Sequence, residues 1–492
     1  MSCVLSIDIG TSSVRTSLCD LGGRALSGAT QSVSHSPDTF SDGGVEMDAD
    51  ALVERVCDCL DRTLDRATAA IGAVKGVGIC SYWHSVLGVN QAGRAVSPIL
   101  VWADTRSIAE VEELKSAFDV PALHRRTGCL PHTSYLPARL RWVRRHRPDW
   151  WSSAHRWMSP GEYLTQRLLG KPLCSVSMAS ATGLYHEQSA SWDAEVLQFL
   201  SLPAERLGEI RRFDQGEVGL QNEFGRRYPQ LKDAVWFPAV GDGACSNVGV
   251  GCVRPERVAM MVGTSGAMRV MKQGDPPPPP AGLWRYRWDH ERFLLGGALS
   301  NGGNLFAWLK DSLQTPSSLE LEVELAAMEP DAHGLTVLPF LAGERCPGWR
   351  GDARAAIVGL SWSTRPAEIV RAGLEAVAYR FALIHELLAD VLPAQHEVLA
   401  TGGALLASRT WTQIIADVLG RPVLASREDE ATSRGAALLA WKALGLLGEL
   451  DATPPRVGSL FEPDPRRYQV YQAARERQAA LYDRLIRTPW SP

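Results

Sequence analysis

The sequence lacks any long uncharged hydrophobic run. No stretch approaches the roughly 18 apolar residues that a membrane-spanning helix needs, which argues against an integral membrane protein. Basic residues are not in excess either: 51 Lys and Arg stand against 55 Asp and Glu, a net charge of −4. The chain therefore has no overall basic footprint for nucleic acid, although a local site for a small anionic or neutral ligand stays open.

Cysteine is also sparse, with ten in 492 residues, and many lie in apolar surroundings, as Cys80 does. This distribution argues against a disulfide framework. Cys57 and Cys59 lie in a helical pattern with no matching second pair, so a zinc site is not expected. The N-terminus continues directly into a strand pattern without the features of a signal peptide. We expect reduced thiols and a cytoplasmic protein.

Hydrophobic periodicity predicts strands that alternate with helices in both halves of the chain. The expected strands are 3–9, 14–20, 24–33, 74–80 and 235–240 in the first half, and 258–262, 267–271, 292–296 and 398–400 in the second. The expected helices are 48 to about 70, 108–118, 135–147, 161–169, 303–312, 366–390, 409–419 and 469–486. A proline run over 275–280 predicts an exposed loop.

A chain of 492 residues is too long for one hydrophobic core. Each half begins with a strand pair and then alternates strands with helices, which predicts an α/β protein of two related domains with a cleft between them. We place the first domain at residues 1–243 and the second at 244–452. Residues 453–492 form a C-terminal tail that carries a helix.

The sequence Gly-Thr-Ser occurs twice, at residues 10–12 and 263–265, each time after an apolar run. Each copy predicts a tight hairpin. Glycine lets the backbone turn sharply and approach a ligand closely. The hydroxyls and free N–H groups of such a turn favour phosphate. Two such turns in separate halves suggest a polyphosphate held from both sides.

Charged residues lie beside these turns. Asp8, at the end of a strand, suits magnesium, and Arg15 could bind a phosphate with two hydrogen bonds. The alternative is an Asx-turn aspartate and a surface arginine. Asp242 lies between two glycines after the strand at 235–240. Since phosphoryl transfer to an alcohol needs a base near the hydroxyl, Asp242 is the candidate catalytic base; the alternative is an ordinary Asp-Gly turn.

Three further segments could contact ligands. The glycines at 402 and 403 follow a strand and precede a helix, and could let an adenine ring lie on the backbone, unless they form an ordinary turn. Tryptophans with neighbouring charged groups, at 83–85 and 102–106, are typical of sites for polyhydroxylated molecules, unless they are core tryptophans beside surface charges. The segment 338–349, with Glu344 and Arg345, is expected to be a rigid structural element at the domain interface or beside the active site.

These motifs, in this order, resemble the FGGY family of carbohydrate kinases from Asp8 to about Leu439. The family's Gly-Leu, spacer and helix pattern is present at 359–375. The resemblance implies two actin-like (ribonuclease H-like) ATPase domains with a catalytic cleft between them, and ATP and Mg²⁺ as cofactors. Where the family usually carries a lysine before Leu-x-Trp, this sequence has Arg139, which keeps the charge but changes the geometry.

The motifs and the resemblance together give the expected site. Asp242 is the catalytic base and Asp8 the metal ligand. The expected nucleotide-binding residues are Thr11, Ser12, Ser13, Arg15, Gly263, Thr264, Ser265, Gly303, Gly402, Gly403 and Ser408. The expected substrate-binding residues are Trp83, His84, Trp102, Asp104, Arg106 and Asp242.

Within the family, residues 83–85 and 262–270 are most similar to bacterial gluconokinases. Phosphorylation of D-gluconate to 6-phospho-D-gluconate is therefore the first hypothesis, with a small sugar acid as partner, no nucleic-acid or membrane partner, and a homodimer compatible with the family. The substrate carboxylate needs a donor, for which His84, Arg106 and Arg139 are candidates. One alternative is a kinase of the same family for xylulose, ribulose or a polyol. The other is a non-catalytic sugar or nucleotide sensor on the same fold.

Overall fold

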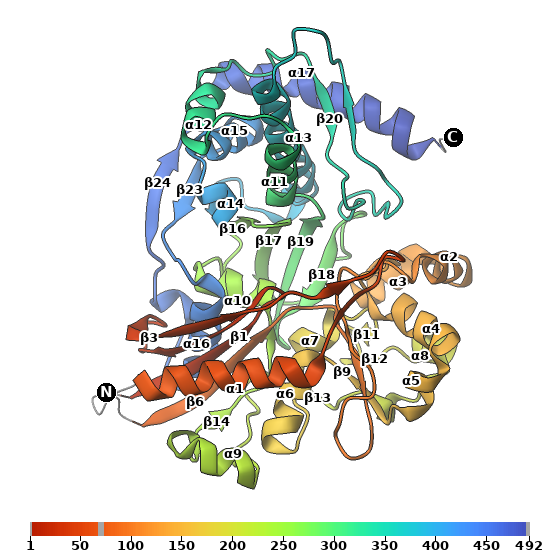
Figure 1. The fold of residues 1–492 in the computed structure, drawn as a ribbon, viewed down its shortest axis with the longest axis vertical. Coiled ribbons are helices and arrows are strands. Elements are labelled where there is room, and N and C mark those ends of the chain that lie inside the picture. The colour runs from red at the N-terminus through yellow and green to blue at the C-terminus, as the bar shows by residue number, and fades with distance from the viewer. Residues whose placement is uncertain (1, 67–72, 489–492) are drawn as a thin grey trace.

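Two mixed β-sheets, each flanked by helices, organise the chain (Figure 1). The structure is a computed structural model that describes residues 2–66 and 73–488. The first sheet has the order β14-β6-β1-β2-β3, with β15 also paired to β6. Its strands are β1 (Cys3–Ile9), β2 (Ser13–Cys19), β3 (Ala25–Ser34), β6 (Val74–Ser81), β14 (Val235–Trp236) and β15 (Val240–Gly241).

The second sheet has the order β18-β19-β17-β16-β22-β23-β24. Its strands are β16 (Arg257–Val262), β17 (Gly266–Gln273), β18 (Trp284–Arg287), β19 (Arg292–Leu299), β22 (Glu397–Thr401), β23 (Val423–Ser426) and β24 (Val457–Phe461). In both sheets an antiparallel unit of three strands is extended by a strand parallel to its first member: β6 beside β1, and β22 beside β16. The two halves thus repeat one topology, as the paired sequence patterns predicted.

The helices are distributed over both halves. The first half holds α1 (Ala49–Arg66), α2 (Ile108–Ala117), α3 (Val120–Thr127), α4 (Leu136–His146), α5 (Pro148–Ser153), α6 (Pro160–Leu169), α7 (Val176–Ser180), α8 (Ala194–Leu200) and α9 (Asn222–Arg227). The remaining helices are α10 (Asp242–Gly249), α11 (Gly303–Ser312), α12 (Ser318–Ala327), α13 (Pro366–Leu387), α14 (Gly403–Leu406), α15 (Arg409–Leu419), α16 (Ala431–Ala443) and α17 (Pro465–Tyr482).

Short strands complete the chain outside the two large sheets. They are β4 (Asp38–Thr39), β5 (Val45–Met47), β7 (Leu87–Val89), β8 (Ile99–Leu100), β9 (Arg156–Met158), β10 (Cys174–Ser175), β11 (Tyr185–His186), β12 (Ser191–Trp192), β13 (Ile210–Arg211), β20 (Thr336–Leu338) and β21 (Ala356–Val358). Most predicted strands and helices are present within a few residues of their expected bounds. The strand expected over 235–240 is divided into β14 and β15, and 67–70 of the first predicted helix lie outside the described residues.

Helix α16 crosses from the second half of the chain to the first sheet, where Figure 1 shows it in blue beside the red strands. The hydroxyl of Thr16 bonds to α1, whereas a Cβ built on Gly78 would lie 2.2 Å from the carbonyl oxygen of Ala436. The β-sheet register places these two positions on opposite faces, so α1 and α16 cover opposite sides of the sheet. The boundary proposed at residue 243 therefore separates the sheets but not all of the helices.

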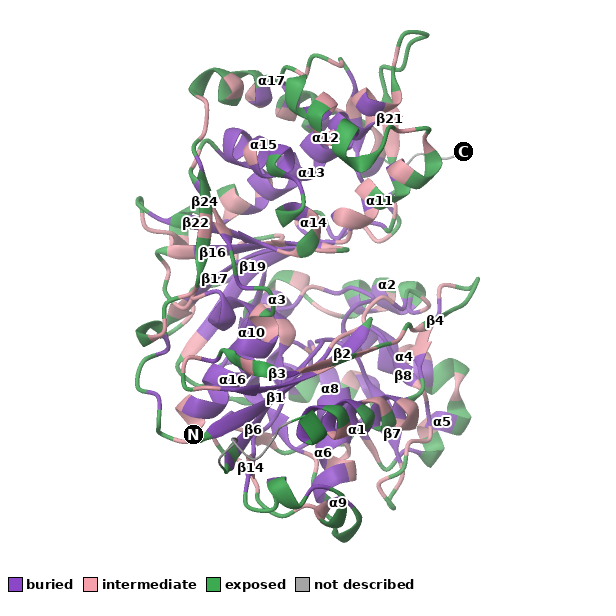
Figure 2. Cartoon of the chain, turned by 60° about the vertical axis from the view of Figure 1, so that its left-hand side comes forward, coloured by how far each residue is buried: buried purple, intermediate pink, exposed green. Residues whose placement is uncertain are grey.

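The described part of the tail, residues 453–488, belongs structurally to the second half. Strand β24 pairs with β23 at the edge of the sheet, and α17 packs against α15 and β20. Figure 2 shows buried residues along the strands and the inner faces of the helices of both halves. All ten cysteines lie within the described residues, and each is buried as a free thiol. Among residues 2–66 and 73–488, no helix has both the length and the apolar composition needed to cross a bilayer.

Candidate active site

A cavity of about 430 Å³ lies between the two sheets and is lined by residues of both halves. Predicted site residues that line it are Thr11, Ser12, Trp83, His84, Trp102, Asp242, Thr264 and Ser265. Lining residues that the sequence did not single out as ligands include His35, Tyr82, Arg269, Trp284, Tyr286 and Arg345. The cavity therefore brings both Gly-Thr-Ser segments and Asp242 to one place.

Both Gly-Thr-Ser segments form the predicted hairpins. The first joins the antiparallel strands β1 and β2, and its turn is closed by a 2.9 Å hydrogen bond from the Gly10 N–H to the Ser13 carbonyl. The second joins β16 and β17 and is closed by a 3.0 Å bond from Gly263 to the Ser265 carbonyl. The indole N–H of Trp102 lies 3.3 Å from the Thr11 hydroxyl oxygen. The first hairpin is thereby linked to the predicted substrate wall.

Asp242 begins α10 directly after β15, between two glycines that cannot carry a side chain. A Cβ on Gly241 would lie 1.8 Å from the indole nitrogen of Trp83, and a Cβ on Gly243 would lie 2.4 Å from a guanidinium nitrogen of Arg269. Trp83 and Arg269 thus pack against the backbone on either side of Asp242. Burial raises the pKa of Asp242 above that of a solvated aspartate.

Asp8 lies at the end of β1, where 5% of the residue is exposed. Burial raises its pKa from 3.8 to about 6; the nearby negative charge of Asp242 adds to this rise, and Arg15 opposes it. The Arg15 guanidinium lies 3.8 Å from the Asp8 carboxylate and 3.3 Å from that of Glu430. The buried carboxylate of Asp8 and the half-buried carboxylate of Asp242, which repel each other, fit the oxygen-donor chemistry of a divalent cation such as Mg²⁺.

The substitution Asp8→Asn is expected to stabilise the free protein at pH 8. Because the folded-state pKa of Asp8 lies above its solvated value, the stability that the group contributes is present below pH 3.8 and is lost as the pH rises through about 6. Removing the charge should raise the free energy of unfolding by about 3 kcal/mol at pH 8 and by about half of that at pH 5. Denaturation curves without nucleotide or metal at both pH values measure this. A variant less stable than the wild type at pH 8 would contradict it.

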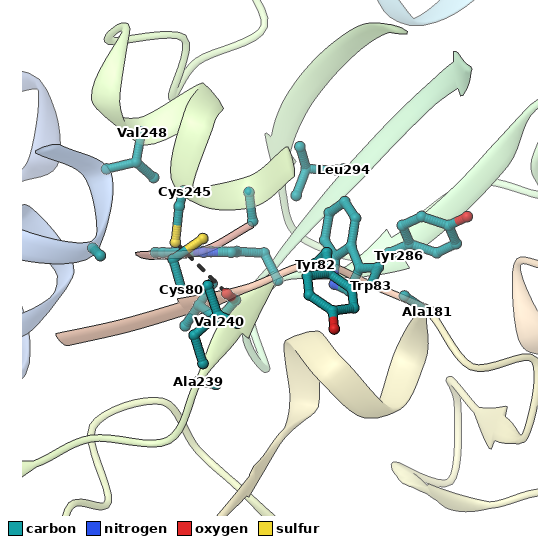
Figure 3. Packing of buried hydrophobic residues seen from close by; sticks show 14 of the residues in the cluster. Cys80, Tyr82, Trp83, Ala181, Ala239, Val240, Cys245, Val248, Tyr286 and Leu294 are labelled. Atoms are coloured by element: carbon teal, nitrogen blue, oxygen red, sulfur yellow. Dashed lines mark hydrogen bonds between the residues drawn. The ribbon is translucent and has the colours of Figure 1, made fainter. Parts of the chain in front are cut away.

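An aromatic wall lines one side of the cavity. Figure 3 shows Trp83 beside Tyr286, with their ring centroids 5.1 Å apart. Tyr286 stacks on Trp284 at 4.2 Å, and its hydroxyl lies 2.6 Å from that of Tyr135. The rings come from both halves, so the wall spans the domain interface. Such a surface can cover the C–H faces of a polyhydroxylated ligand.

His84 presents a hydrogen-bond acceptor to this wall. Its Nδ1 lies 2.6 Å from the carbonyl oxygen of Ala181, which can only accept, so Nδ1 carries the proton. Burial lowers the pKa of His84 well below its ordinary value, and the ring is neutral. Nε2 then has a free lone pair, which suits a substrate hydroxyl and not a carboxylate.

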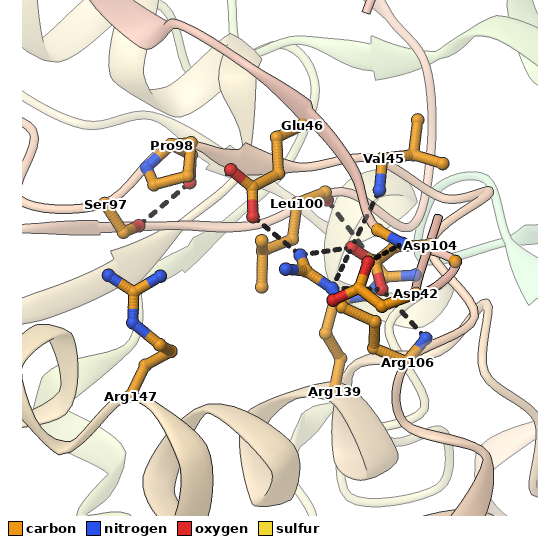
Figure 4. A network of polar contacts seen from close by, with 12 residues as sticks. Asp42, Val45, Glu46, Ser97, Pro98, Leu100, Asp104, Arg106, Arg139 and Arg147 are labelled. Carbon is orange, nitrogen blue, oxygen red and sulfur yellow. Dashed lines mark hydrogen bonds and ion pairs between the residues drawn. The ribbon is translucent and has the colours of Figure 1, made fainter. Parts of the chain in front are cut away.

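Asp104 and Arg106, both predicted to bind substrate, pair with each other instead (Figure 4). The Arg106 Nε lies 3.1 Å from the Asp104 carboxylate, and its Nη2 donates to Glu46 at 2.7 Å. Asp104 also accepts a hydrogen bond from the Val45 N–H at 3.1 Å. Neither residue lines the cavity, so they brace the loop before α2. The prediction that Asp104 and Arg106 bind the substrate therefore does not fit their positions.

Arg139, another candidate for the substrate carboxylate, is 1% exposed and bonds to backbone carbonyls. It donates to the carbonyl of His84 and, at 2.8 Å, to that of Thr133. His84 has a φ of 63°, a conformation unusual for a residue other than glycine. Arg139 therefore fixes the backbone that aims His84, and a lysine could not reach both carbonyls in the same way.

The predicted nucleotide glycines meet behind the second hairpin. The Gly303 N–H donates to the Gly263 carbonyl at 2.8 Å, and a Cβ on Gly303 would lie 2.4 Å from that oxygen. Gly402 has a φ of 96° and lies against Val262. Gly403 is exposed, and a Cβ there would meet no atom of the described residues within 4 Å, which leaves the open face that a flat ligand needs.

Three further predicted nucleotide ligands lie outside the cavity lining. Ser408 caps α15 by accepting from the Trp411 N–H at 3.0 Å, and its hydroxyl donates to Glu322 at 2.8 Å. Its hydroxyl therefore has a structural role. Ser13 is buried in β2, and Arg15 faces Asp8 and Glu430.

Substitutions at the neighbouring residues Gly402 and Gly403 should affect different properties, fold stability at the first and nucleotide binding at the second. Gly403→Leu covers the open face and should raise the KM for ATP at least about tenfold with an unchanged melting temperature. Gly402→Ala places a Cβ 2.4 Å from the Val262 carbonyl oxygen at a positive φ, so it should lower the melting temperature. Steady-state kinetics and thermal melts compare the two. An unchanged KM in Gly403→Leu would remove this face from the nucleotide site.

Two neighbouring residues of the segment 338–349 have different roles. Glu344 makes structural contacts, and Arg345 lines the cavity. The Glu344 carboxylate accepts from Arg380 and lies 2.5 Å from the Tyr482 hydroxyl. Arg345 lines the cavity, with its guanidinium 5.7 Å from the centroid of the Trp102 ring. The predicted rigid element and the alternative position beside the active site thus both apply.

Two models of one protein family match this chain. They describe the N-terminal and C-terminal domains of the FGGY family of carbohydrate kinases and match residues 3–223 and 258–444. The chain belongs to the FGGY family of carbohydrate kinases. Sugar kinases of this family use ATP as phosphate donor, and the predicted actin-like fold of two domains is confirmed.

Relatives within this family carry different names. A gluconokinase of Bacillus subtilis is 24% identical over 482 residues, covering 94% of this chain and 92% of the relative. A glycerol kinase of Aromatoleum aromaticum is 29% identical over 498 residues, covering 98% and 97%. The crystal structure of a ligand-bound xylulose kinase from Lactobacillus acidophilus superposes with a TM-score of 0.91 at 25% identity, covering 99% of each chain. These similarities establish a carbohydrate kinase and leave its acceptor to be determined.

The unpredicted cavity residues had different signals in the sequence. Arg269 is a lone charge in the apolar strand Ala-Met-Arg-Val-Met, and Arg345 lies in a segment already noted. In each case the signal in the sequence is a charged residue within a segment that is otherwise apolar or rigid. Trp284 and Tyr286 alternate in a strand that was not predicted, and their ring positions depend on pairing with β19.

Proposed function

We propose that this protein transfers the γ-phosphoryl group of ATP to the primary hydroxyl of D-gluconate, giving 6-phospho-D-gluconate. The observation that most strongly supports the kinase reaction is that both Gly-Thr-Ser hairpins and Asp242 line a single cavity between the domains. Gluconate as the acceptor is supported by the resemblance of 83–85 and 262–270 to gluconokinases and by the gluconokinase relative. A cytoplasmic homodimer stays a prediction.

In the proposed reaction, Asp242 accepts the proton of the acceptor hydroxyl. The hydroxyl oxygen forms a bond to the γ-phosphorus while the bond from that phosphorus to the bridging oxygen of ADP breaks. A raised pKa improves Asp242 as a base near neutral pH. The remaining task is positioning and charge stabilisation, which we assign to the hairpins at Thr11 and Thr264.

Asp8, with Asp242 nearby, would hold Mg²⁺, and the fit rests on the mutual repulsion of these two carboxylates. When bound, Mg²⁺ would supply neutralisation of the charge on the phosphate oxygens. Arg15 would orient the phosphates from the same side through its guanidinium. His84 would accept a hydrogen bond from a hydroxyl group of gluconate. The rings of Trp83 and Trp102 would cover the carbon chain of gluconate.

A coupled ADP-release assay over a panel of acceptors tests this proposal. We expect D-gluconate to give the highest kcat/KM among gluconate, xylulose, ribulose and glycerol. Turnover of xylulose, ribulose or glycerol without turnover of gluconate would contradict gluconate as the acceptor but would still support a carbohydrate kinase. ATP and acceptor binding without ADP release would instead support a sensor on the same fold.

A further inference from the structure

Two arginines of the cleft have guanidinium nitrogens without acceptors. Arg269 is 5% exposed and Arg345 9% exposed, and both line the cavity. Nε and Nη2 of Arg269, and Nε of Arg345, are buried without a hydrogen-bond partner among residues 2–66 and 73–488. Two other buried arginines have carboxylate partners, Arg285 with Glu187 at 2.8 Å and Arg371 with Glu375 at 2.6 Å, and the buried Arg139 donates to backbone carbonyls.

A buried guanidinium without an anion is costly, so the two arginines call for a negatively charged partner. Asp242 is near enough to both for their charges to lower its pKa, Arg269 more than Arg345. One carboxylate nevertheless faces two positive charges in the cavity lining, since His84 is neutral. The missing partner is therefore an anionic ligand bound beside Asp242.

The sheet register directs Arg269 toward the cavity. Arg269 pairs with Gly296, and Gly296 pairs with Trp284, which places all three on one face of the second sheet. The neighbouring pair, Met268 and Gly297, lies on the opposite face, where Gly297 contacts Ile384 of α13. Arg269 thus belongs to the aromatic wall, not to the hairpin turn of its own strand.

Arg345 approaches the same wall from the second domain. Its guanidinium lies 5.7 Å from the Trp102 ring centroid, and its charge contributes to lowering the pKa of His84. In the proposed reaction, the phosphate groups are assigned to the two hairpins and Arg15. The two arginines instead border the aromatic surface, where the acceptor would lie. Their ligand is therefore better sought on the acceptor than on ATP.

We propose that Arg269 and Arg345 together bind the carboxylate of the acceptor and make the cleft selective for sugar acids over neutral polyols. Planar guanidinium groups can bind a carboxylate with paired hydrogen bonds. This assignment replaces the earlier candidates, because Arg106 and Arg139 are committed to protein groups and His84 offers an acceptor. It rests on the proposed kinase function of the same cleft.

The test compares D-gluconate with D-gluconamide, which has the same carbon chain and an uncharged amide in place of the carboxylate. The wild-type protein should prefer gluconate by about 100-fold in kcat/KM. Arg269→Gln and Arg345→Gln should each lose about 100-fold on gluconate, mainly through KM, and stay within about threefold on gluconamide. Arg269→Lys, which keeps the charge, should recover part of the loss. The KM for ATP should not change.

Each other outcome overturns a distinct statement. If the wild-type protein has similar kcat/KM values on gluconate and gluconamide, the carboxylate assignment is wrong. This comparison needs no variant, so a variant that fails to fold does not prevent the test. Equal losses on both acceptors would place the arginines at the phosphoryl group, which overturns the inference and leaves gluconate as substrate. Turnover of xylulose or glycerol with none of gluconate would overturn both the proposed acceptor and this inference.

Discussion

Asp242→Asn should lower kcat about 1,000-fold while the protein stays folded, since a positioned general base contributes roughly 10²- to 10⁴-fold. Asparagine keeps the shape of the side chain and an oxygen that can accept from the Gly243 N–H, which lies 2.7 Å from the carboxylate. The amide cannot take the proton of the attacking hydroxyl. The KM values for ATP and the acceptor should change little, because the contacts of the hairpins are retained.

The pH dependence gives a second readout for the same variant. Asp242 must be ionised to act as a base, and burial raises its pKa, so wild-type kcat/KM should fall on the acidic side at a pH above the usual aspartate range. In Asp242→Asn the side chain does not titrate, so the fall of kcat/KM that protonation of Asp242 causes should be absent. Asp311→Asn, at an exposed position of α11, is the matched control and should behave as the wild type. Full turnover by Asp242→Asn would exclude it as the base.

Gly241→Ala should cost at least about 100-fold in kcat/KM and destabilise the fold by about 1–3 kcal/mol. The added Cβ would lie 1.8 Å from the Trp83 indole nitrogen, so the ring or the backbone must move. The ring is held by a 3.1 Å hydrogen bond to the Ser177 carbonyl, and Gly241 itself donates to the Ser177 hydroxyl at 3.2 Å. Movement of either would displace Asp242, which is the next residue.

The control for this substitution is Gly448→Ala, where a Cβ would meet no atom within 4 Å in the part of the chain that the structure describes. It should leave both kcat/KM and the melting temperature unchanged. Thermal melts and kinetics of the two variants separate a local clash from a general effect of glycine replacement. Wild-type activity in Gly241→Ala would show that the wall at Trp83 does not position Asp242.

Local chemistry made the hairpins and Asp242 predictable from the sequence. A Gly-Thr-Ser turn uses consecutive residues, and the alternation of apolar positions around it identifies the two strands that it joins. The α/β class and the repeated halves follow from the same patterns. The resemblance to a known family then supplied the order in which these parts assemble.

Long-range contacts decided the rest, and residue patterns do not encode them directly. Arg106 looked like a substrate ligand beside Trp102, but its partner Glu46 lies 60 residues earlier in the chain. The packing of α16 on the first sheet depends on close approach at Gly78, where a Cβ would lie 2.2 Å from the Ala436 carbonyl oxygen. The position of Arg269 in the lining of the cavity depends on the register between β17 and β19.

The most direct test of the proposed phosphoryl transfer is the product itself. The protein, MgATP and D-gluconate are incubated together and followed by ³¹P NMR with proton coupling. We predict one new phosphomonoester, formed in step with ADP and coupled to the two protons on C6 of gluconate. Release of inorganic phosphate alone, or a phosphate on another carbon, would contradict the proposed transfer to the primary hydroxyl of gluconate.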